Sequence, residues 1–414
     1  MVKRRISLNS LRNLTVGLLL VTLGLVIGYR YGQAGSTPTN IPLSQVIKTK
    51  APAERENVDF STFWEVWSFL DQTYLDSEKL DSRQMVDGAI SGMTAAIGDP
   101  YTAYLPPKQN QRSAEDLAGS FYGVGIVLGY IDETLAVMSP LDGTPAAAAG
   151  IQAGDLILHV KDVTKDLDED TTNWTLNEAM EKIRGKKNVH VTLTLMRKNE
   201  DDEYDEPFEV DITRGEIVVE SVTVKFIEAN GKKVAHLKVT KFGERTPHEL
   251  DTAIKEILAQ DRIDSVFLDL RNNPGGFFDG AIDLASEFVE SGVVVTEKDK
   301  YTSKDFSAKG KARLAQFPVL VLVNKGSASA SEIVAGALRD QLDAKLIGEN
   351  TFGKGTVQDR RELSNGGGLH VTIARWLLPH GDWIHETGIP VNIEVKDDYE
   401  TEPDEVILRA IEEL

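Results

Sequence analysis

The sequence predicts an α/β domain that follows a strand-rich module and a helical segment, so that the 414 residues divide into two or three domains. Three patterns predict this fold class. Short apolar strands alternate with amphipathic helices over residues 234–395, which is typical of α/β folds. Residues 121–214 are rich in strand-forming runs and turn residues. Residues 58–98 carry aromatic and aliphatic side chains at helical spacing.

The N-terminus has the pattern of a targeting segment. Basic residues precede a largely apolar run over residues 14–31. At about 1.5 Å per residue a helix of this length covers about 27 Å, close to the hydrocarbon thickness of a bilayer. We therefore expect residues 1–35 to form a cytoplasmic basic tip and a transmembrane anchor, with the rest of the chain outside the cytoplasm. The alternative is a cleaved signal and a secreted protein, since Gly32-Gln-Ala34 has the small-x-small pattern of a cleavage site.

The next two segments are expected to be a linker and a helical region. Residues 36–56 are rich in Ser, Thr, Pro and Asn, as flexible linkers are. Residues 57–110 form the N-terminal helical segment, with an aromatic stripe in the first helix and a second helix over residues 82–97. The stripe either joins the core or pairs with a second subunit in a homodimer. The motif Gly98-Asp-Pro-Tyr-Thr then interrupts the helix.

The segment over residues 319–332, VLVLVNKGSASASE, combines a strand, three serines and the start of a helix. A hydroxyl at a helix N-terminus lies where free N–H groups stabilise an oxyanion. Acyl-transfer enzymes with a nucleophilic serine use this arrangement on several folds. Ser329 and Glu332 also fit a capping box, the commoner reason for a serine at a helix start. The pattern itself does not choose Ser329 over Ser327 or Ser331.

Two further segments favour the catalytic interpretation. Residues 268–276, LDLRNNPGG, lead a strand into paired glycines, which let backbone amides approach a ligand as an oxyanion hole requires. Residues 348–358, GENTFGKGTVQ, place Lys354 between two glycines. A lysine serves as a general base only where desolvation lowers its pKa. Gln358 is well placed to donate or accept a hydrogen bond beside that lysine.

Composition and spacing exclude several other chemistries. The chain has no cysteine, which excludes thiolate catalysis and cysteine-based metal sites. The Gly353-Lys354 pair resembles part of a phosphate-binding loop, but Gly355 stands where a Ser or Thr should hold magnesium. The seven histidines follow no metal-ligand spacing, so we expect no metal and no cofactor. A formal net charge of −20 argues against nucleic acid as a partner.

The strand-rich module resembles a PDZ domain. Its Tyr122-Gly-Val-Gly-Ile126 segment resembles the carboxylate-binding loop, and residues 139–160 resemble the strand, short helix and strand that follow. The loop amides are expected to bind a C-terminal carboxylate while the peptide adds as a strand to the domain edge. These amides belong to Val124, Gly125 and Ile126. A helix over residues 177–184 would line the groove, and Arg184 at its end either couples peptide binding to the active site or caps the helix.

Taken together, these segments resemble the carboxy-terminal processing proteases, a family of Ser/Lys-dyad peptidases that carry a PDZ domain. The matching segments follow the family's order over about 300 residues. The resemblance implies Ser329 as nucleophile, Lys354 as general base and Gln358 as the residue that orients the lysine. It also implies an oxyanion hole formed by the amides of Gly275 and Ala330. Near the C-terminus the chain departs from the family, with Gly388-Ile-Pro-Val-Asn-Ile in place of the usual Pro-Asp after the glycine; we expect this to affect strand geometry and not the chemistry.

The resemblance further implies the architecture and the activity. The architecture is a crotonase-like ββα spiral for the protease core over residues 216–397, a PDZ domain inserted at residues 111–215 and a C-terminal helix over residues 398–414. The activity is that of a membrane-anchored serine endopeptidase that binds exposed apolar C-termini of protein substrates and cleaves through an acyl-enzyme. A non-catalytic scaffold that captures protein C-termini is the alternative class, but a scaffold needs neither the serine, the lysine, the glutamine nor the paired glycines.

Overall fold

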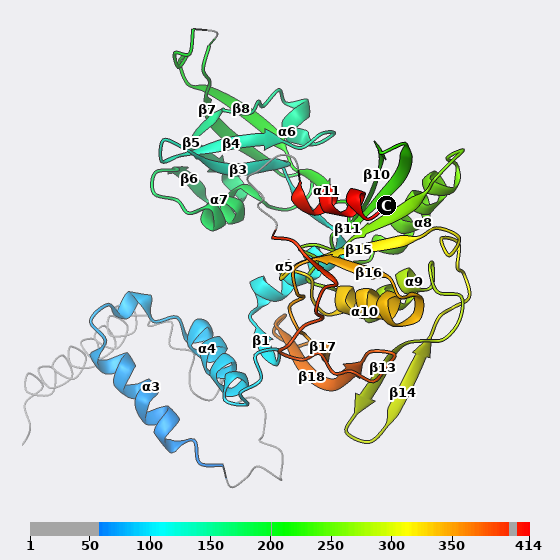
Figure 1. Cartoon of the computed structure of the whole chain (residues 1–414). Coiled ribbons are helices and arrows are strands. Elements are labelled where there is room, and N and C mark those ends of the chain that lie inside the picture. The colour runs from blue at the N-terminus through cyan, green and yellow to red at the C-terminus, as the bar shows by residue number, and fades with distance from the viewer. Residues whose placement is uncertain (1–57, 200, 397–403) are drawn as a thin grey trace, which may run out of the picture. The chain divides into compact units, whose positions relative to one another are not determined.

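The computed structural model describes residues 58–199, 201–396 and 404–414, and the chain divides into two units, residues 1–90 and 91–414 (Figure 1). The expected basic tip, membrane anchor and linker lie outside the described residues. In the part of the chain that is described, no helix has the length and apolar character to cross a membrane.

The described part of the first unit is helical. It contains α3 (Ser61–Thr73), the short 3₁₀ helix η2 (Ser77–Lys79) and most of α4 (Ser82–Ala95). Helix α3 buries none of its residues within the chain. Val66 and Phe69 of α3 and its N-cap residue Phe60 are each more than half exposed.

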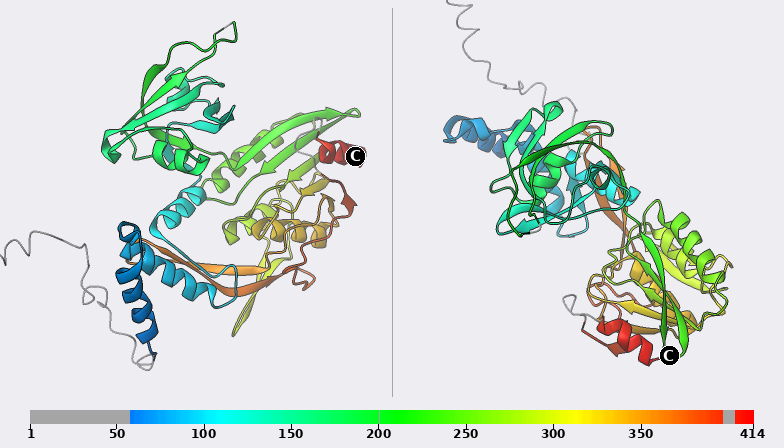
Figure 2. Two further views of the ribbon diagram at one scale, coloured as in Figure 1. Left: turned by 90° about the vertical axis from the view of Figure 1, so that its left-hand side faces the viewer. Right: turned by 90° about the horizontal axis from the view of Figure 1, so that it is seen from above.

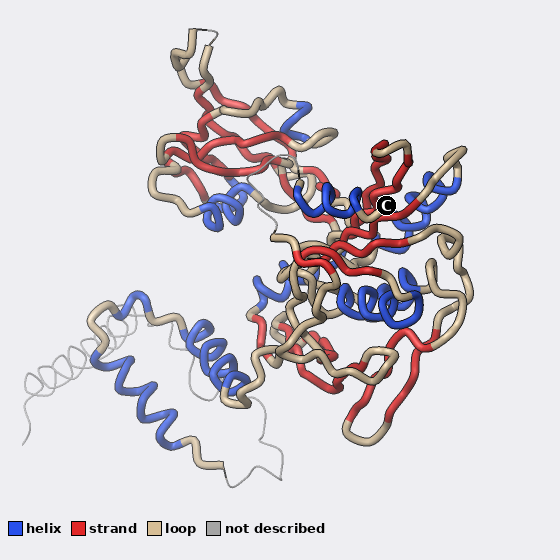
Figure 3. Tube along the Cα trace, viewed as in Figure 1, coloured by secondary structure: helices blue, strands red, loops and turns tan. Residues whose placement is uncertain are grey.

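The strand-rich module contains a six-stranded antiparallel sheet in the order β3-β4-β5-β7-β8, with β6 paired to β5 (Figures 1 and 3). Buried side chains of α6 and α7 join those of the sheet in one hydrophobic core. The strands are β3 (Ile126–Ile131), β4 (Thr134–Pro140), β5 (Leu156–Asp162), β6 (Leu167–Asp170), β7 (His190–Met196) and β8 (Phe208–Thr213). The helices are α6 (Pro145–Ala148), α7 (Leu176–Ile183) and the 3₁₀ helix η3 (Val163–Lys165).

The chain enters and leaves the strand-rich module through a two-stranded antiparallel ribbon. Strand β2 (Ser120–Gly123) pairs antiparallel with β9 (Gly215–Val218), so the entry and the exit of the module lie side by side. Helix α5 (Pro107–Ala118) precedes β2 and ends at Gly119, whose φ of 70° terminates the helix.

The α/β core is organised around a second six-stranded sheet, in the order β10-β11-β12-β15-β16-β19. Its neighbours are parallel from β11 to β19, and β10 is antiparallel to β11. The mixed α/β class predicted for residues 234–395 is therefore confirmed. The strands are β10 (Val222–Ala229), β11 (Lys232–Val239), β12 (Ser265–Asp269), β15 (Val319–Val323), β16 (Lys345–Gly348) and β19 (Ile393–Glu394).

Successive side chains of a strand point to opposite faces of the sheet, so the apolar strands present apolar side chains on both faces. Helices cover both of these faces. One face packs in the main core cluster with α8 (Thr246–Leu258), α9 (Phe278–Ala285) and α10 (Ala330–Leu342). The other face packs against the C-terminal helix α11 (Glu405–Glu412), through Phe267, Leu322 and Ile347 on the sheet and Val406 and Ala410 on the helix (Figure 2).

A third sheet stands beside the core and carries residues of the candidate site. Strand β18 pairs on one edge with β17 and on the other with β1 and β13, and β13 continues to β14. In this sheet β18 lies between β1, which precedes the strand-rich module, and β17, which follows the Lys354 loop. The strands are β1 (Ala103–Leu105), β13 (Val293–Asp299), β14 (Ser303–Ser307), β17 (Thr356–Glu362) and β18 (Gly368–Leu377).

Candidate active site

The three serines that follow strand β15 have different environments. Ser327 Oγ donates to the carbonyl of Leu270 at 2.8 Å, and Ser331 Oγ donates to the carbonyl of Asn273 at 2.8 Å. Both serines are fully buried. Ser329 is partly exposed and precedes α10 with φ 55° and ψ −115°. A positive φ is strained for serine, and such strain is typical of a nucleophile at a strand-to-helix turn, so the geometry favours Ser329.

Gly275 lies directly against the Ser329 segment. A Cβ on Gly275 would stand 2.8 Å from the Cβ of Ser329 and 3.1 Å from the amide nitrogen of Ala330, so only glycine fits here. The Gly275 φ of 102° also favours glycine. The backbones of Gly275 and Ala330, the two expected oxyanion donors, thus lie close together beside Ser329.

The Gly275 amide already has a partner in this structure. It donates to Asn273 Oδ1 at 2.9 Å, and the Asn273 amide group donates in turn to the carbonyl of Val239 at 2.9 Å. An oxyanion bound by Gly275 therefore has to share or displace the Asn273 carboxamide. Asn273 was not identified from the sequence, because its role depends on the side-chain orientation in the Asn-Asn-Pro-Gly-Gly turn.

Glu332 connects the serine segment to the lysine loop. Its carboxylate is fully buried and accepts hydrogen bonds from the Ser329 amide at 2.7 Å and the Thr351 hydroxyl at 2.6 Å. It also accepts from the amides of Gly353 at 2.6 Å and Lys354 at 2.9 Å. Burial raises the pKa of Glu332, against the lowering effect of these hydrogen bonds. The capping box suggested by the sequence is therefore part of a hydrogen-bond network that joins the serine segment to the lysine loop.

Lys354 has the environment that a lysine base needs. Burial lowers the pKa of Lys354, while the carboxylates of Glu332 and Asp99 act in the opposite direction. Its Nζ lies 5.1 Å from the ring centre of Tyr101. The loop backbone is fixed by two indoles: Trp376 Nε1 donates to the Lys354 carbonyl at 3.1 Å and Trp383 Nε1 donates to the Gly355 carbonyl at 2.9 Å.

Among the described residues, Gln358 forms hydrogen bonds with two threonines and none with Lys354. It is the third residue of β17, and its Nε2 donates to Thr356 Oγ1 at 2.9 Å and Thr372 Oγ1 at 3.2 Å. Within the described part of the chain, the Gln358 amide makes no hydrogen bond to Lys354. The expected orienting contact is therefore absent from this arrangement, and the role of Gln358 stays a prediction.

The predicted peptide-binding loop has a tightly constrained backbone. Gly125 has φ 82°, and a Cβ there would stand 2.3 Å from the Cβ of Thr144, so the loop requires glycine. The carbonyls of Val124 and Gly125 accept from Ala146 and Leu141 at 2.8 and 2.9 Å. Ile126 begins β3, whose strand partner in the described chain is β4 alone. The other edge of β3 therefore has main-chain groups with which an added peptide strand could pair.

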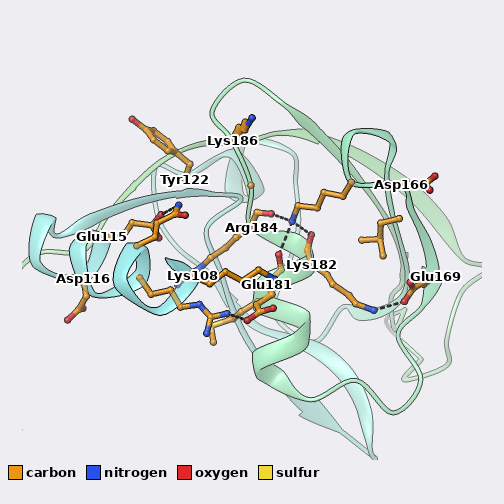
Figure 4. A pocket seen from close by; sticks show the side chains of 16 residues that line it. Lys108, Glu115, Asp116, Tyr122, Asp166, Glu169, Glu181, Lys182, Arg184 and Lys186 are labelled. Carbon is orange, nitrogen blue, oxygen red and sulfur yellow. Dashed lines mark hydrogen bonds and ion pairs between the residues drawn. The ribbon is translucent and has the colours of Figure 1, made fainter. Parts of the chain in front are cut away.

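A cavity of about 870 Å³ surrounds the end of α7 and reaches α5 (Figure 4). Arg184 is the C-cap residue of α7, and its guanidinium lies 3.8 Å from the ring centre of Phe121. Burial lowers the pKa of Arg184. Lys165 Nζ donates to the carbonyls of Glu181 and Lys182, each at 2.8 Å, and also to that of Arg184. Lys165, not Arg184, thus satisfies the last carbonyls of α7.

Comparison with known proteins identifies the family of these segments. Residues 233–395 match Peptidase family S41, residues 112–196 match the PDZ domain, and residues 21–108 match the activating protease CtpB N-terminal domain. The chain is 36% identical over 320 residues to the carboxy-terminal processing protease CtpA of Bacillus subtilis. The chain belongs to the carboxy-terminal processing protease family. It is also 32% identical over 322 residues to CtpB of the same organism.

The alignments with these carboxy-terminal processing proteases cover 77% of this chain, and 66% of CtpA and 64% of CtpB. The chain thus spans slightly under two thirds of the length of the curated relatives it matches. Among solved structures, a putative S41 protease from Bacteroides fragilis has a similar fold, with a TM-score of 0.54 and 17% identity, covering 83% of this chain and 95% of that one.

Proposed function

We propose that this member of the carboxy-terminal processing protease family is a serine endopeptidase that uses Ser329 as nucleophile and Lys354 as general base. One observation carries the proposal. The strained Ser329 and the partly buried Lys354 come from two separate segments, and the same buried carboxylate, that of Glu332, binds the backbone amides of both. A purely structural capping box would not need the lysine loop.

The proposed reaction proceeds in two halves. Ser329 Oγ attacks the scissile carbonyl, and neutral Lys354 accepts the hydroxyl proton. The carbonyl oxygen becomes an oxyanion beside the amides of Gly275 and Ala330. The intermediate then collapses, the Lys354 ammonium donates its proton to the leaving amine, and an acyl-enzyme remains. A water molecule, deprotonated by Lys354, attacks the ester, and the proton returns to Ser329 Oγ as the new carboxylic acid leaves.

The PDZ module is proposed to select substrates by their C-termini. The amides of Val124, Gly125 and Ile126 bind the terminal carboxylate, and the tail adds as a strand along the free edge of β3. Burial of one apolar terminal side chain contributes about 1.5–3 kcal/mol. At about 1.4 kcal/mol per tenfold, that gives a preference of roughly 10–100-fold for apolar tails.

The location is a proposal that rests on the N-terminal sequence. The apolar run over residues 14–31 would anchor the protein in the cell membrane with its catalytic part outside the cytoplasm, unless the segment is cleaved and the protein secreted. The exposed aromatic face of α3 is proposed to pair with a second copy of the chain.

Cleavage of an unfolded reporter protein tests the proposed dyad. Ser329→Ala and Lys354→Ala should each abolish turnover while circular dichroism and melting remain those of the wild type. Lys354→Arg should also be inactive, because a guanidinium does not deprotonate at usable pH. Lys325→Ala is a matched control, since this lysine precedes the same serines but is exposed and paired with Glu349. Turnover retained in Lys354→Arg would exclude the base assignment, and no turnover by the folded wild-type protein would favour the non-catalytic scaffold.

A further inference from the structure

The turn that follows α4 brings two side chains to Lys354 that the sequence pattern did not connect with catalysis. The Asp99 carboxylate accepts from the Tyr101 amide at 3.0 Å and from Thr102 Oγ1 at 2.7 Å. Thr102 Oγ1 accepts in turn from the Thr372 amide on β18 at 3.1 Å. The turn is thereby fixed to the sheet that carries Gln358, so its side chains have defined positions beside the lysine loop.

Aromatic rings form a wall on this side of Lys354. The Tyr101 ring centre lies 5.1 Å from Lys354 Nζ, and the His385 ring stands edge-on to Tyr101 at 5.9 Å. His385 stacks on Trp383 with ring centres 5.1 Å apart. Trp383 is itself hydrogen bonded to the lysine loop through the Gly355 carbonyl. The Lys354 amine lies over the Tyr101 ring, which therefore covers one side of it.

Charged and titratable groups reach the lysine from several elements. Glu332 comes from α10 and Asp99 from the turn, and both carboxylates raise the pKa of Lys354 against the larger effect of burial. Burial alone would raise the pKa of Asp99, but hydrogen bonds from Thr372 and Thr102 lower it overall, so Asp99 is ionised at neutral pH. The titratable rings nearby are those of Tyr101, His370 and His385. The pKa of Tyr101 is raised, first by burial and then by the charges of Glu332, Asp99 and Glu386. The pKa of His370 is lowered, first by burial and then by the charges of Arg360 and Lys354.

We propose that Tyr101 and Asp99 are positioning residues that set the pH range in which Lys354 acts as a base. The ring keeps water from the amine and so favours its neutral form. This effect outweighs the attraction of the ring face for the ammonium form, because burial is the largest influence on the pKa of Lys354. The Asp99 carboxylate favours the ammonium form. The two residues therefore act in opposite directions from one turn. The inference rests on the proposed Ser329/Lys354 function and deepens it.

The effects of Tyr101 and Asp99 can be distinguished by the direction in which the loss of each shifts the pH profile of activity. Loss of the Tyr101 ring admits water, so protonation of Lys354 becomes easier and the acid limb of the activity profile moves to higher pH. Loss of the Asp99 charge makes protonation harder, so the acid limb moves to lower pH. On the acid side, a midpoint displaced by about one pH unit changes the rate about tenfold. A merely structural role of the turn would reduce the rate at every pH without moving the two midpoints apart.

The experiment measures the second-order rate of fluorophosphonate labelling from pH 5 to 10 in the full chain. We expect Tyr101→Ala to raise the midpoint, Asp99→Asn to lower it, and Tyr101→Phe, which keeps the ring, to retain the wild-type midpoint. The chain offers matched controls in the Asp299-Lys-Tyr-Thr302 turn. There Asp299 accepts from the Tyr301 amide at 2.6 Å and from Thr302 Oγ1 at 3.0 Å, but Tyr301 is 84% exposed. Asp299→Asn and Tyr301→Ala should leave the profile unchanged.

Each outcome decides the inference. The inference would be overturned if the midpoints of Tyr101→Ala and Asp99→Asn moved in the same direction, or if both stayed at the wild-type value. In either case, absence of labelling in Lys354→Ala would leave the proposed Ser/Lys function standing. Wild-type labelling of Lys354→Ala would instead overturn the proposed function itself. If Tyr101→Ala does not fold, as judged by circular dichroism, the near-isosteric Asp99→Asn still carries the test through its lowered midpoint.

Discussion

The backbone amides of Ser329 and Lys354 donate to the same atom, Glu332 Oε2, at 2.7 and 2.9 Å. The other carboxylate oxygen of Glu332 accepts from Thr351 and Gly353. A buried carboxylate with four donors helps to fix the distance between the two loops, which are also joined by the hydrogen bond from the Phe352 amide to the Ser327 carbonyl at 3.0 Å. The position of the proposed dyad therefore depends on a third residue that need not touch the substrate.

Replacing Glu332 should disrupt the dyad and the fold together. Glu332→Ala leaves four donors without their acceptor, and the two buried ones, the Thr351 hydroxyl and the Gly353 amide, each cost about 1–3 kcal/mol before relaxation. We expect a lower midpoint of urea unfolding and a loss of reporter cleavage. Glu332→Gln keeps the shape but loses the charge, so it should retain more stability than Glu332→Ala while activity falls. Full activity in Glu332→Ala would show that the two loops are held by other contacts.

The C-terminal helix should stabilise the turn that carries Gly275. Asp404 caps α11 by accepting from the Ile407 amide at 2.9 Å, and it pairs with both terminal nitrogens of Arg271 at 3.0 and 2.8 Å. Arg271 also binds the buried Asp269 at the end of β12. Asp404→Ala should therefore lower the free energy of unfolding by about 1–2 kcal/mol, measured in urea. Glu412→Ala, which removes an exposed pair with Arg409, should change it much less.

The Asp404 effect should depend on pH. Burial alone would raise the pKa of Asp404, but the hydrogen bonds from Arg271 lower it overall. A depressed folded-state pKa stabilises the fold above the unfolded value of about 3.9, and this contribution is lost as the pH falls through the folded value. The difference in unfolding free energy between wild type and Asp404→Asn should thus shrink in acid. A difference that grows in acid would contradict the ionised Asp404–Arg271 pair.

Tail selection by the PDZ module can be tested at one glycine. Reporters that end in Ala, Val or Leu should be degraded faster than the same reporters ending in Asp or carrying an amidated C-terminus. Gly125→Ala should erase that preference, because its Cβ would clash with Thr144 at 2.3 Å and distort the loop. Gly150→Ala is the control, since Gly150 has a similar φ of 76° but open space around it. No effect of tail identity in the wild type would mean that this module does not select C-termini.

Membrane anchoring by residues 14–31 predicts a simple fractionation result. The full-length protein should pellet with membranes and resist extraction with alkaline carbonate, and its core should be open to protease added from outside the cell. N-terminal sequencing of the purified product decides the alternative. A soluble product that begins near Gly35 would show that the segment is a cleaved signal.

The parts that the sequence predicted are those that depend on local pattern. Strand-helix alternation predicted the mixed sheet of the core, and the Gly-Val-Gly segment predicted the loop before β3. The parts that it did not predict depend on long-range contacts. Glu332 meets Gly353 21 positions later, and Arg271 meets Asp404 133 positions later. No periodicity in a single sequence reports such pairs, and the expected Gln358–Lys354 contact depended on side-chain orientation.

The identity of the nucleophile is tested most directly by the site of covalent labelling. The purified protein is treated with a fluorophosphonate, digested, and the modified residue is located by mass spectrometry. We predict one adduct, on Ser329, that is lost in Ser329→Ala. Ser327→Ala and Ser331→Ala should still be labelled, though each should be less stable because its buried hydrogen bond is lost. An adduct on Ser327 or Ser331, or none on a folded protein at any pH from 7 to 10, would contradict the assignment of Ser329 as nucleophile.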